Sequence, residues 1–431
     1  MSAPTSRRVE GTYYALTLGS TLAASFIWGI NTLFLLDAGL TNLEAFAANA
    51  FFTAGMVLFE IPTGVVADTW GRRASYLLGT LTLAVTTALY WLMWVWQAPF
   101  WAWALVSVLL GLGFTFFSGA VDAWLVDALR ATGHRGALEG VFGRAQVVSG
   151  VAMLTGSVAG GVIAQATNLG VPFLVRAGVL VAMLVIAAVL MRDLGFTPVR
   201  GATPGAAVRE VMHASVRHGL GRPPIRWVMI ATPFTAGVGI YAFYALQPYL
   251  LELGGDDGAY ALAGLAAAII SGASIAGGAL APLVRRLVRR RTTLLLASAA
   301  TSAAVLVAFS FVQQLWVAIA LLAAWGIASS IGQPAQRAYL NDMIPSQQRA
   351  TVLSFYSLLG SAGGVVIQPA LGRAADVGGY GLSLLWGGAI SALALPFLAL
   401  SRAQHDPADT AVAPGEAAAG PDDDASDARE R

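Results

Sequence analysis

The 431-residue chain contains no cysteine and no lysine, so all 25 of its basic residues are arginine. Without cysteine there is no disulfide, thiolate nucleophile, iron–sulfur cluster or cysteine zinc site. Without lysine there is no Walker A motif, whose lysine contacts a nucleotide phosphate, and no Schiff-base chemistry. The four histidines form no HExxH motif. The sequence therefore offers no motif for ATP hydrolysis, metal binding or covalent catalysis, and we expect a protein that is not an enzyme.

Charged residues are also scarce: they make up 11% of the chain, whereas 57% of its residues are hydrophobic. A soluble protein is typically about 25% charged and about 45–50% apolar. This chain has too few charges to cover the surface of a water-soluble fold of its length. The composition therefore predicts an all-α integral membrane protein that crosses the bilayer many times.

Long hydrophobic runs occur along nearly the whole chain. A bilayer-crossing helix needs about 20 apolar residues, and twelve segments approach or exceed this length, with a polar stretch between the sixth and the seventh. The expected spans are 12–36, 43–66, 74–96, 100–129, 140–166, 171–192, 226–251, 259–284, 292–312, 315–340, 350–371 and 380–402. The expected regions are a cytoplasmic N-terminus at 1–11, a six-helix bundle at 12–192, a cytoplasmic linker at 193–225, a second six-helix bundle at 226–402 and a disordered acidic tail at 403–431.

The arginines are concentrated in alternate loops between the expected spans. Arg72 and Arg73 follow the second span, and five arginines lie within 285–291, whereas acidic residues dominate most of the other loops. Loops rich in arginine and lysine stay in the cytoplasm, so we expect both termini to be cytoplasmic. Abundant alanine, glycine and arginine beside an absence of lysine are typical of a GC-rich bacterial genome, which predicts a bacterial inner membrane.

The two halves of the sequence are weakly similar to each other at a shift of about 215 residues. Chance similarity between apolar helices explains shared alanine and leucine, but it does not explain charges in register. A duplicated six-helix unit indicates two pseudo-symmetric halves with a transport site between them. The shift places Asp122 on Arg337, Asp127 on Asp342, and Arg72 and Arg73 near Arg290 and Arg291.

The loop after the second span carries a recognisable motif. Residues 64–73 read GVVADTWGRR and match the pattern GxxxD(R/K)xGR(R/K), with threonine at the first basic position. Together with twelve spans and a central linker, this motif resembles the major facilitator superfamily of secondary transporters, over nearly the whole chain. The matching residues are Gly64, Asp68, Gly71, Arg72 and Arg73.

Three further segments resemble a bacterial branch of drug:proton antiporters that includes tetracycline exporters. Two are SGAVDAWLVDAL at 118–129 and the segment 345–354 that opens the eleventh span. The third is the fifth span, which resembles the antiporter motif GxxxxxxxxGxxxGPxxGG with Ser157 in place of its proline. The motif glycines are Gly143, Gly156, Gly160 and Gly161.

The family resemblance implies a latch between the halves at the cytoplasmic ends of spans two to five. Such a latch would hold an outward-open state through charge pairs and contacts with helix ends. Charged side chains that reach a wet interface are the structural alternative. The latch candidates are Gly64, Asp68, Gly71, Arg72, Arg73, Asp127, Glu139 and Arg144.

The resemblance also implies that spans one, four, seven and ten line a central cavity. Because ionisable groups inside a membrane are costly, we hypothesise that Asp122 and Arg337 face each other there, as a pair or as separate contacts to a polar cargo. A packing salt bridge from Asp122 to Arg144 is the alternative. Tyr241 and Tyr244 lie one turn apart, as stacking partners for a flat cargo would. The other cavity candidates are Asn31, Thr115, Ser118, Gln247, Ser330 and Gln333.

Glu60 and Asp122 are the two candidates for a proton-coupling carboxyl group. Glu60 shares a helix face with Thr53 and Met56, and desolvation in a poorly hydrated helix favours the neutral form of a carboxyl group. A hydrogen bond to backbone freed by Pro62 is the alternative role for Glu60.

These patterns predict a secondary active transporter that exports small amphipathic, drug-like molecules against protons by alternating access. A proton-coupled metabolite importer and a lipid flippase or transporter-like sensor are the alternatives. The expected partners are the cargo, protons and membrane lipids. We expect no nucleic acid, no metal and no cofactor, with the proton gradient as the energy source, and we expect a monomer.

Overall fold

The computed structural model describes residues 5–117, 119–134, 136–198, 204–256, 258–345 and 348–410. Among the sequence predictions, the cavity candidate Ser118 and the tail residues 411–431 lie outside the described residues.

The N-terminal half is built from long apolar helices, two of which continue across a short break. Its helices are α1 (Ser6–Trp28) continuing as α2 (Asn31–Asp37), α3 (Asn42–Trp70), α4 (Arg72–Trp96), α5 (Phe100–Thr115) continuing as α6 (Ala120–Ala131), α7 (Leu138–Ala166) and α8 (Val171–Leu190).

The C-terminal half repeats this arrangement after a helical linker. The linker holds α9 (Pro204–Ser215) and the π-helical turn η1 (Val216–Leu220). The half itself holds α10 (Pro223–Gly254), α11 (Tyr260–Leu287), α12 (Arg291–Phe309), α13 (Leu315–Ile331) continuing as α14 (Gln333–Met343), α15 (Arg349–Ala392), α16 (Ala394–Ala403) and the 3-10 turn η3 (Pro407–Asp409).

By length and hydropathy, the described residues contain ten helices able to cross a membrane, or up to eleven when the bent pair α1 and α2 is one span. The last of them, Thr351–Ala403, has 53 residues and is long enough to cross twice. Its backbone breaks at Gly378 and Gly379, where Gly379 has φ 73°. Counting two spans there brings the number to twelve, and the expected all-α membrane fold is confirmed.

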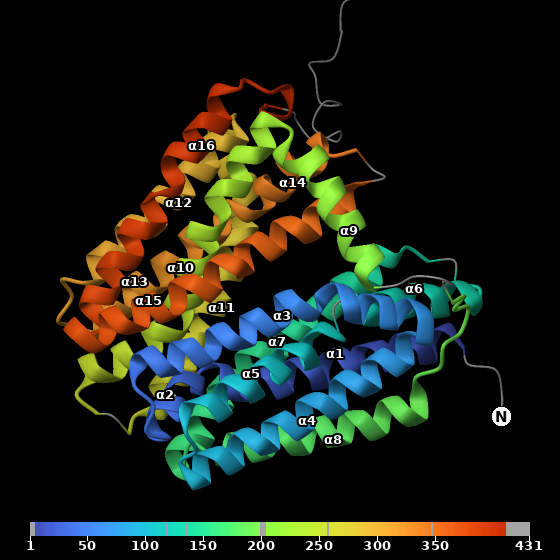
Figure 1. The fold of residues 1–431 in the computed structure, drawn as a ribbon, viewed down its shortest axis with the longest axis horizontal. Coiled ribbons are helices and arrows are strands. Elements are labelled where there is room, and N and C mark those ends of the chain that lie inside the picture. Colours follow the sequence, from blue (N-terminus) through green and yellow to red (C-terminus); the bar gives the residue numbers. More distant parts are fainter. Residues whose placement is uncertain are drawn as a thin grey trace, which may run out of the picture.

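The two halves are joined at one end and diverge toward the other (Figure 1). Helix α3 packs along α15, and α7 packs along α11. In the described part of the chain, every hydrogen bond that connects the two halves is found either at the loops remote from the termini or within the adjoining part of the helices, as far as their middle. We call the joined end the closed end, and the other, which carries the N-terminus and α9, the termini end.

The break between α1 and α2 is stabilised by contacts with the C-terminal half. The two helices are bent by 47°, which frees the carbonyl of Trp28, and Gln247 Nε2 donates to that oxygen at 2.9 Å. A Cβ on Gly29 would lie 2.8 Å from Gly264 Cα, so only glycine permits this approach. The irregular backbone is therefore satisfied by protein, as a membrane interior requires.

The prediction of a disordered tail beginning at residue 403 is wrong for residues 403–410. After α16 the chain forms an ordered turn around η3, and the side chain of Asp409 is buried there. The physical reason is that the Asp409 carboxylate accepts hydrogen bonds at the N-terminus of α12. Composition alone does not reveal such a partner.

Candidate functional site

A cavity of about 870 Å³ lies at the centre of the molecule. Most of its wall comes from the C-terminal half, and the N-terminal half contributes Trp28, Phe52, Thr53 and Met56. Its lining is apolar and aromatic with interspersed hydroxyl and carboxamide groups, and among the described lining residues only Arg337 carries a charge. No described residue of α5 or α6 lines the cavity, so the expected contribution of span four is absent from this conformation.

The candidates on span ten do lie in the cavity wall. Gln333 and Arg337 of α14 are exposed and line the cavity, and Ser330, a buried residue just before the break, also lines it. Tyr356 of α15, another lining residue, is an electrostatic neighbour of Arg337. The break between α13 and α14 at Gly332 thus directs a short polar helix toward the cavity. A cargo there meets one fixed cation and several hydrogen-bonding groups.

Aromatic rings cover the part of the cavity nearest the closed end. The rings of Trp28 and Phe243 meet edge to face with centroids 6.5 Å apart, and those of Phe243 and Tyr244 lie 5.1 Å apart. Phe52 adds a further ring to this wall. Such faces suit the apolar or flat part of a cargo.

Four other cavity candidates are buried in packing contacts instead. The prediction that Tyr241 and Tyr244 together stack on a cargo is wrong, because Tyr241 is fully buried and only Tyr244 of the two lines the cavity. The hydrogen bonds of the four side chains are Asn31 Nδ2 to Asn49 Oδ1 at 2.9 Å, Thr115 Oγ1 to the carbonyl of Leu112 at 2.8 Å, Tyr241 Oη to Ser383 Oγ at 2.6 Å and Gln247 Nε2 to the carbonyl of Trp28 at 2.9 Å.

Asp122 does not face Arg337 in this structure. It is exposed in the first turn of α6 and accepts a 2.7 Å hydrogen bond from Tyr13 Oη of α1. The alternative bridge to Arg144 is not formed either, since Arg144 Nη1 lies 3.9 Å from Glu10 Oε2. Asp122 therefore connects α6 to α1 within the N-terminal half.

Glu60 is half-buried on α3, one turn beyond Met56. Thr53 and Met56 both line the cavity, and residues spaced by three, four or seven share a helix face. Glu60 thus extends the lining stripe of α3 toward the termini end. Next to Pro62, the Thr63 hydroxyl donates to the carbonyl of Phe59 at 2.8 Å.

The signature loop is held together within the N-terminal half. Arg72 forms an ion pair with Asp68 four residues earlier. Asp193, just after α8, accepts the backbone N–H of Arg73 at 2.9 Å, and the Arg73 guanidinium donates to the carbonyl of Ala188 at 2.8 Å. Gly71 has φ 108° and its missing Cβ leaves room for Asp193. Because α3 and α4 diverge from the other half here, the described residues form no latch between the halves at this point.

The remaining latch candidates lie in different surroundings and do not form one cluster. Gly64 has open space around its Cα, so no close approach explains it. A Cβ added to Gly195 would lie 2.9 Å from the backbone oxygen of Asp127, and Glu139 lies exposed at the start of α7. The motif in the sequence identifies the loop, but it does not identify Asp193, which accepts the backbone N–H of Arg73.

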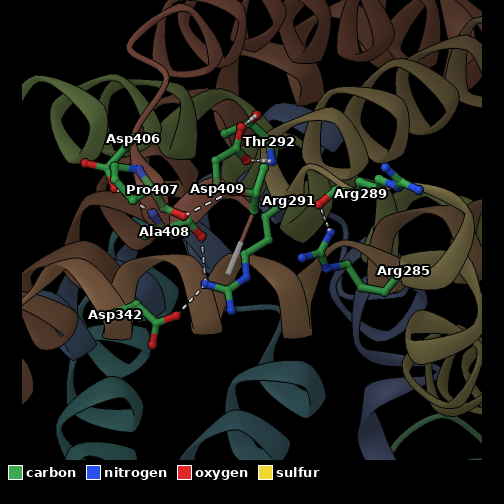
Figure 2. A network of polar contacts seen from close by, with 10 residues as sticks. Arg285, Arg289, Arg291, Thr292, Asp342, Asp406, Pro407, Ala408 and Asp409 are labelled. Atoms are coloured by element: carbon green, nitrogen blue, oxygen red, sulfur yellow. Dashed lines mark hydrogen bonds and ion pairs between the residues drawn. The ribbon is translucent and has the colours of Figure 1, made fainter. Parts of the chain in front are cut away.

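The C-terminal half contains an equivalent network (Figure 2). Arg291 Nη1 donates to Asp342 Oδ2 at 2.6 Å and to the carbonyl of Ala408 at 2.9 Å. Asp409 accepts the backbone N–H and the hydroxyl of Thr292. Asp193 and Asp409 thus follow the last span of each half and cap the helix after each basic loop. The internal repeat contains the signal that could have found both.

Asp193 and Asp409 each act within one half, whereas a third acidic residue, Asp376, connects the two halves at the closed end. Asp376 of α15 accepts the backbone N–H groups of Asn42 and Leu43, both at 2.9 Å, at the first turn of α3. Tyr380 Oη also donates to Asn42 Oδ1. A carboxylate at a helix N-terminus is favoured by the helix dipole. No local sequence signal identifies this contact, because the two segments lie far apart in the chain.

The glycines of the fifth span play two different roles. Gly161 lies against α11 of the other half, where an added Cβ would be 2.5 Å from the carbonyl oxygen of Tyr260. A Cβ added to Gly156 or Gly160 would lie 1.9 Å from an atom of α1, and Gly143 has open space around it. Three of the four predicted glycines therefore occupy close helix contacts.

These features define a helical membrane transporter with two repeated halves around a central cavity. The sequence matches the Major Facilitator Superfamily profile over residues 13–367 and 271–421, and the chain belongs to that family. It is a membrane transporter rather than an enzyme. No curated protein is significantly similar to it in sequence.

Several solved structures share the fold at low sequence identity. The nucleoside transporter NupG, as its D323A mutant, has a TM-score of 0.77 and 12% identity, covering 91% of this chain and 99% of that one. A POT family transporter in complex with a thioalcohol-conjugated peptide has a TM-score of 0.71 and 10% identity, covering 92% and 96%. A bacterial homologue of the human lysosomal transporter Spinster, inward-facing and unoccupied, has a TM-score of 0.68 and 17% identity, covering 93% and 98%.

Proposed function

We propose that this protein exports small amphipathic molecules across a bacterial inner membrane in exchange for protons. The observation that carries the proposal is the cavity, whose apolar and aromatic walls hold hydroxyl and carboxamide groups and one charged side chain, Arg337. Such a lining favours a cargo with a large apolar part and a small polar part. A sugar or an oligopeptide would need a denser set of polar contacts.

The orientation follows from the basic loops. Arg72, Arg73 and Arg285–Arg291 lie at the termini end, and basic loops remain cytoplasmic. With this orientation the separated ends of the helices face the cytoplasm, which supports an inward-open state. An exporter must load its cargo in this state.

A proton gradient supplies enough energy for this exchange. One pH unit is worth about 1.4 kcal/mol, and one charge moved through 100 mV is worth about 2.3 kcal/mol. One or two protons therefore sustain roughly a tenfold to thousandfold cargo gradient. Glu60 and Asp122 are the proposed carboxyl groups, because Glu60 extends the cavity-lining face of α3 and Asp122 is exposed on α6.

Everted membrane vesicles from cells that express the chain provide the test. Respiration acidifies their lumen, and a pH-sensitive dye reports the gradient while ethidium, 2-naphthoate or 2-naphthamide is added outside, on the cytoplasmic face. An exporter that exchanges cargo for protons collapses the gradient in response to at least one probe, and Arg337→Gln weakens the response to the anionic probe 2-naphthoate. An importer gives no such response but takes up cargo with protons from the opposite face, and a sensor binds a probe without moving it.

A further inference from the structure

Arg176 is a buried guanidinium group without a counter-ion. It lies in the second turn of α8, a membrane-spanning helix, and only 2% of its surface is exposed. Among the described residues it has no ion pair and no hydrogen bond, and its Nε atom is buried without a partner. Neither the cavity nor the signature loop includes this residue.

The immediate surroundings of Arg176 are aromatic. The guanidinium carbon lies 5.7 Å from the centre of the Phe114 ring, and the phenol groups of Tyr90 and Tyr244 are its electrostatic neighbours. The Tyr90 hydroxyl is already engaged with Ser107. A cation–π contact recovers only part of the cost of burying a charge, so this arrangement retains an unsatisfied cation. Ionisable groups kept at such a cost inside membranes usually have a function.

Arg176 lies directly behind the aromatic end of the cavity. Tyr244 lines the cavity and neighbours the guanidinium. Phe114, which carries the cation–π contact, packs edge to face on Phe52 with centroids 5.3 Å apart, and Phe52 also lines the cavity. One layer of side chains thus separates Arg176 from the cavity. Arg337 stands in the opposite half, nearer the termini end.

The two arginines therefore bracket the transport pathway, and no carboxylate lies among the described residues that line it. We propose that Arg176 binds the anionic group of the cargo when the aromatic layer opens, which makes the cargo an amphipathic organic anion such as an aromatic carboxylate or sulfonate. This inference rests on the proposed transport function. While the aromatic layer is in place, as in this structure, Tyr244 and Phe114 shield the Arg176 guanidinium, and the anion pairs with Arg337.

Binding of two matched probes to the purified full-length protein in nanodiscs tests the proposal. The probes are radiolabelled 2-naphthoate and 2-naphthamide, which share ring and shape but differ in charge. Hydrogen bonds to charged groups predict that the wild type prefers the anion roughly tenfold or more. Arg176→Gln removes most of this preference, Arg176→Lys keeps part of it, and Arg373→Gln, a charge deletion at an exposed site of the closed end, leaves it unchanged.

A second measurement separates binding from a structural role. If Arg176 binds cargo, then Arg176→Gln removes an unpaired buried charge, and the melting temperature from circular dichroism stays the same or rises. A lower melting temperature together with an unchanged preference for 2-naphthoate overturns the proposal. So does a wild type without preference for the anion, including one that binds neither probe.

Transport separates this inference from the function on which it rests. An Arg176-dependent preference for 2-naphthoate without proton-linked movement of any probe retains the anion site and overturns the exporter. Proton-linked movement of 2-naphthamide and 2-naphthoate at equal rates in the wild type and in Arg176→Gln retains the exporter and overturns the anion site.

Discussion

Asp409 accepts two hydrogen bonds from Thr292, one from the backbone N–H at 2.7 Å and one from the hydroxyl at 2.8 Å. Asp193 accepts the backbone N–H of Arg73 in the same way at 2.9 Å. In both halves, the chain leaving the last span therefore returns a carboxylate to the N-terminus of the helix after the basic loop. Each carboxylate satisfies a backbone donor that lacks a partner in its own helix.

Replacing Asp409 by alanine is expected to destabilise the C-terminal half. The loss of a helix N-cap costs about 0.5–2 kcal/mol, and Thr292 is buried, so water does not readily replace the carboxylate. The midpoint of thermal denaturation in detergent should fall. Truncation after residue 403 should have the same effect, whereas truncation after residue 410 should not, because Ala408 and Asp409 make the contacts of this turn with α12. Equal stability of the two truncated proteins would contradict the assignment.

Asp376 is expected to hold the closed end shut. Its carboxylate accepts the N–H groups of Asn42 and Leu43 across the halves, and these bonds break when that end opens. Asp376→Ala should therefore favour the outward-open state by about 1 kcal/mol, roughly fivefold in population. The solvent-exposed position of Asp376 argues against a larger effect.

The absence of native cysteine makes the distance measurement simple. Spin labels on Trp101→Cys and Phe311→Cys lie at exposed positions on opposite halves of the closed end. The longer-distance population should grow in the Asp376→Ala background. Asp256→Asn is the matched control, since among the described residues its side chain accepts a hydrogen bond only from Gly258 of the same loop. An unchanged distance distribution in Asp376→Ala would remove this residue from the gate.

The spans and the signature loop could be predicted because each rests on a local requirement. A helix in lipid must be apolar along its length, and a basic loop must stay on one side of the membrane. Gly71 could be singled out because the turn beside Asp193 needs its backbone angle. Arg337 and Gln333 were assigned to the cavity because the family resemblance implies that span ten lines it.

The partners of these residues could not be predicted in the same way. Asp376 and Asn42 are 334 positions apart, and each alone is typical of an ordinary loop or helix end. Arg176 belongs to a span that reads as uniformly apolar apart from this residue, and only the packing of α5 and α10 around it reveals that it has no counter-ion. Asp122 was paired with Arg337 by symmetry, but the termini ends of the two halves are separated in this structure (Figure 1). The internal repeat of the sequence does not indicate which conformational state the two halves adopt.

Gly161 and Gly143 belong to one motif, but substitutions at the two positions should have opposite effects. At Gly161 a Cβ would lie 2.5 Å from a backbone oxygen of α11, whereas at Gly143 there is open space. Overpacking of this kind costs about 1–3 kcal/mol, so Gly161→Ala should separate α7 from α11 and open the closed end. Gly143→Ala should be neutral or slightly stabilising, because alanine favours a helix over glycine by up to about 1 kcal/mol.

The label pair on Trp101→Cys and Phe311→Cys also reports this difference. Gly161→Ala should lengthen the measured distance, and Gly143→Ala should leave it as in the parent protein. If both variants gave the parent distribution, the contact between α7 and α11 would not control the closed end.

Glu60 is expected to couple transport to protons. It extends the face of α3 that contributes Thr53 and Met56 to the cavity, so its carboxyl group is placed where a change in the tilt of α3 alters its hydration. Glutamine keeps the size and hydrogen-bonding capacity of the neutral acid but cannot release a proton. Glu60→Gln should therefore still exchange labelled 2-naphthoate for unlabelled 2-naphthoate across proteoliposomes at equal pH, while losing accumulation driven by a pH gradient.

Two companion variants make the result specific. Glu139→Gln removes an exposed acid at the termini end and should retain accumulation. Asp122→Asn removes the other proposed proton carrier, which accepts the Tyr13 hydroxyl, and should retain accumulation if Glu60 alone couples. Loss of accumulation in Asp122→Asn with full accumulation in Glu60→Gln would transfer the coupling role to Asp122. Asparagine still accepts the Tyr13 hydrogen bond, so that outcome would follow from the missing proton site rather than from a broken contact between α1 and α6.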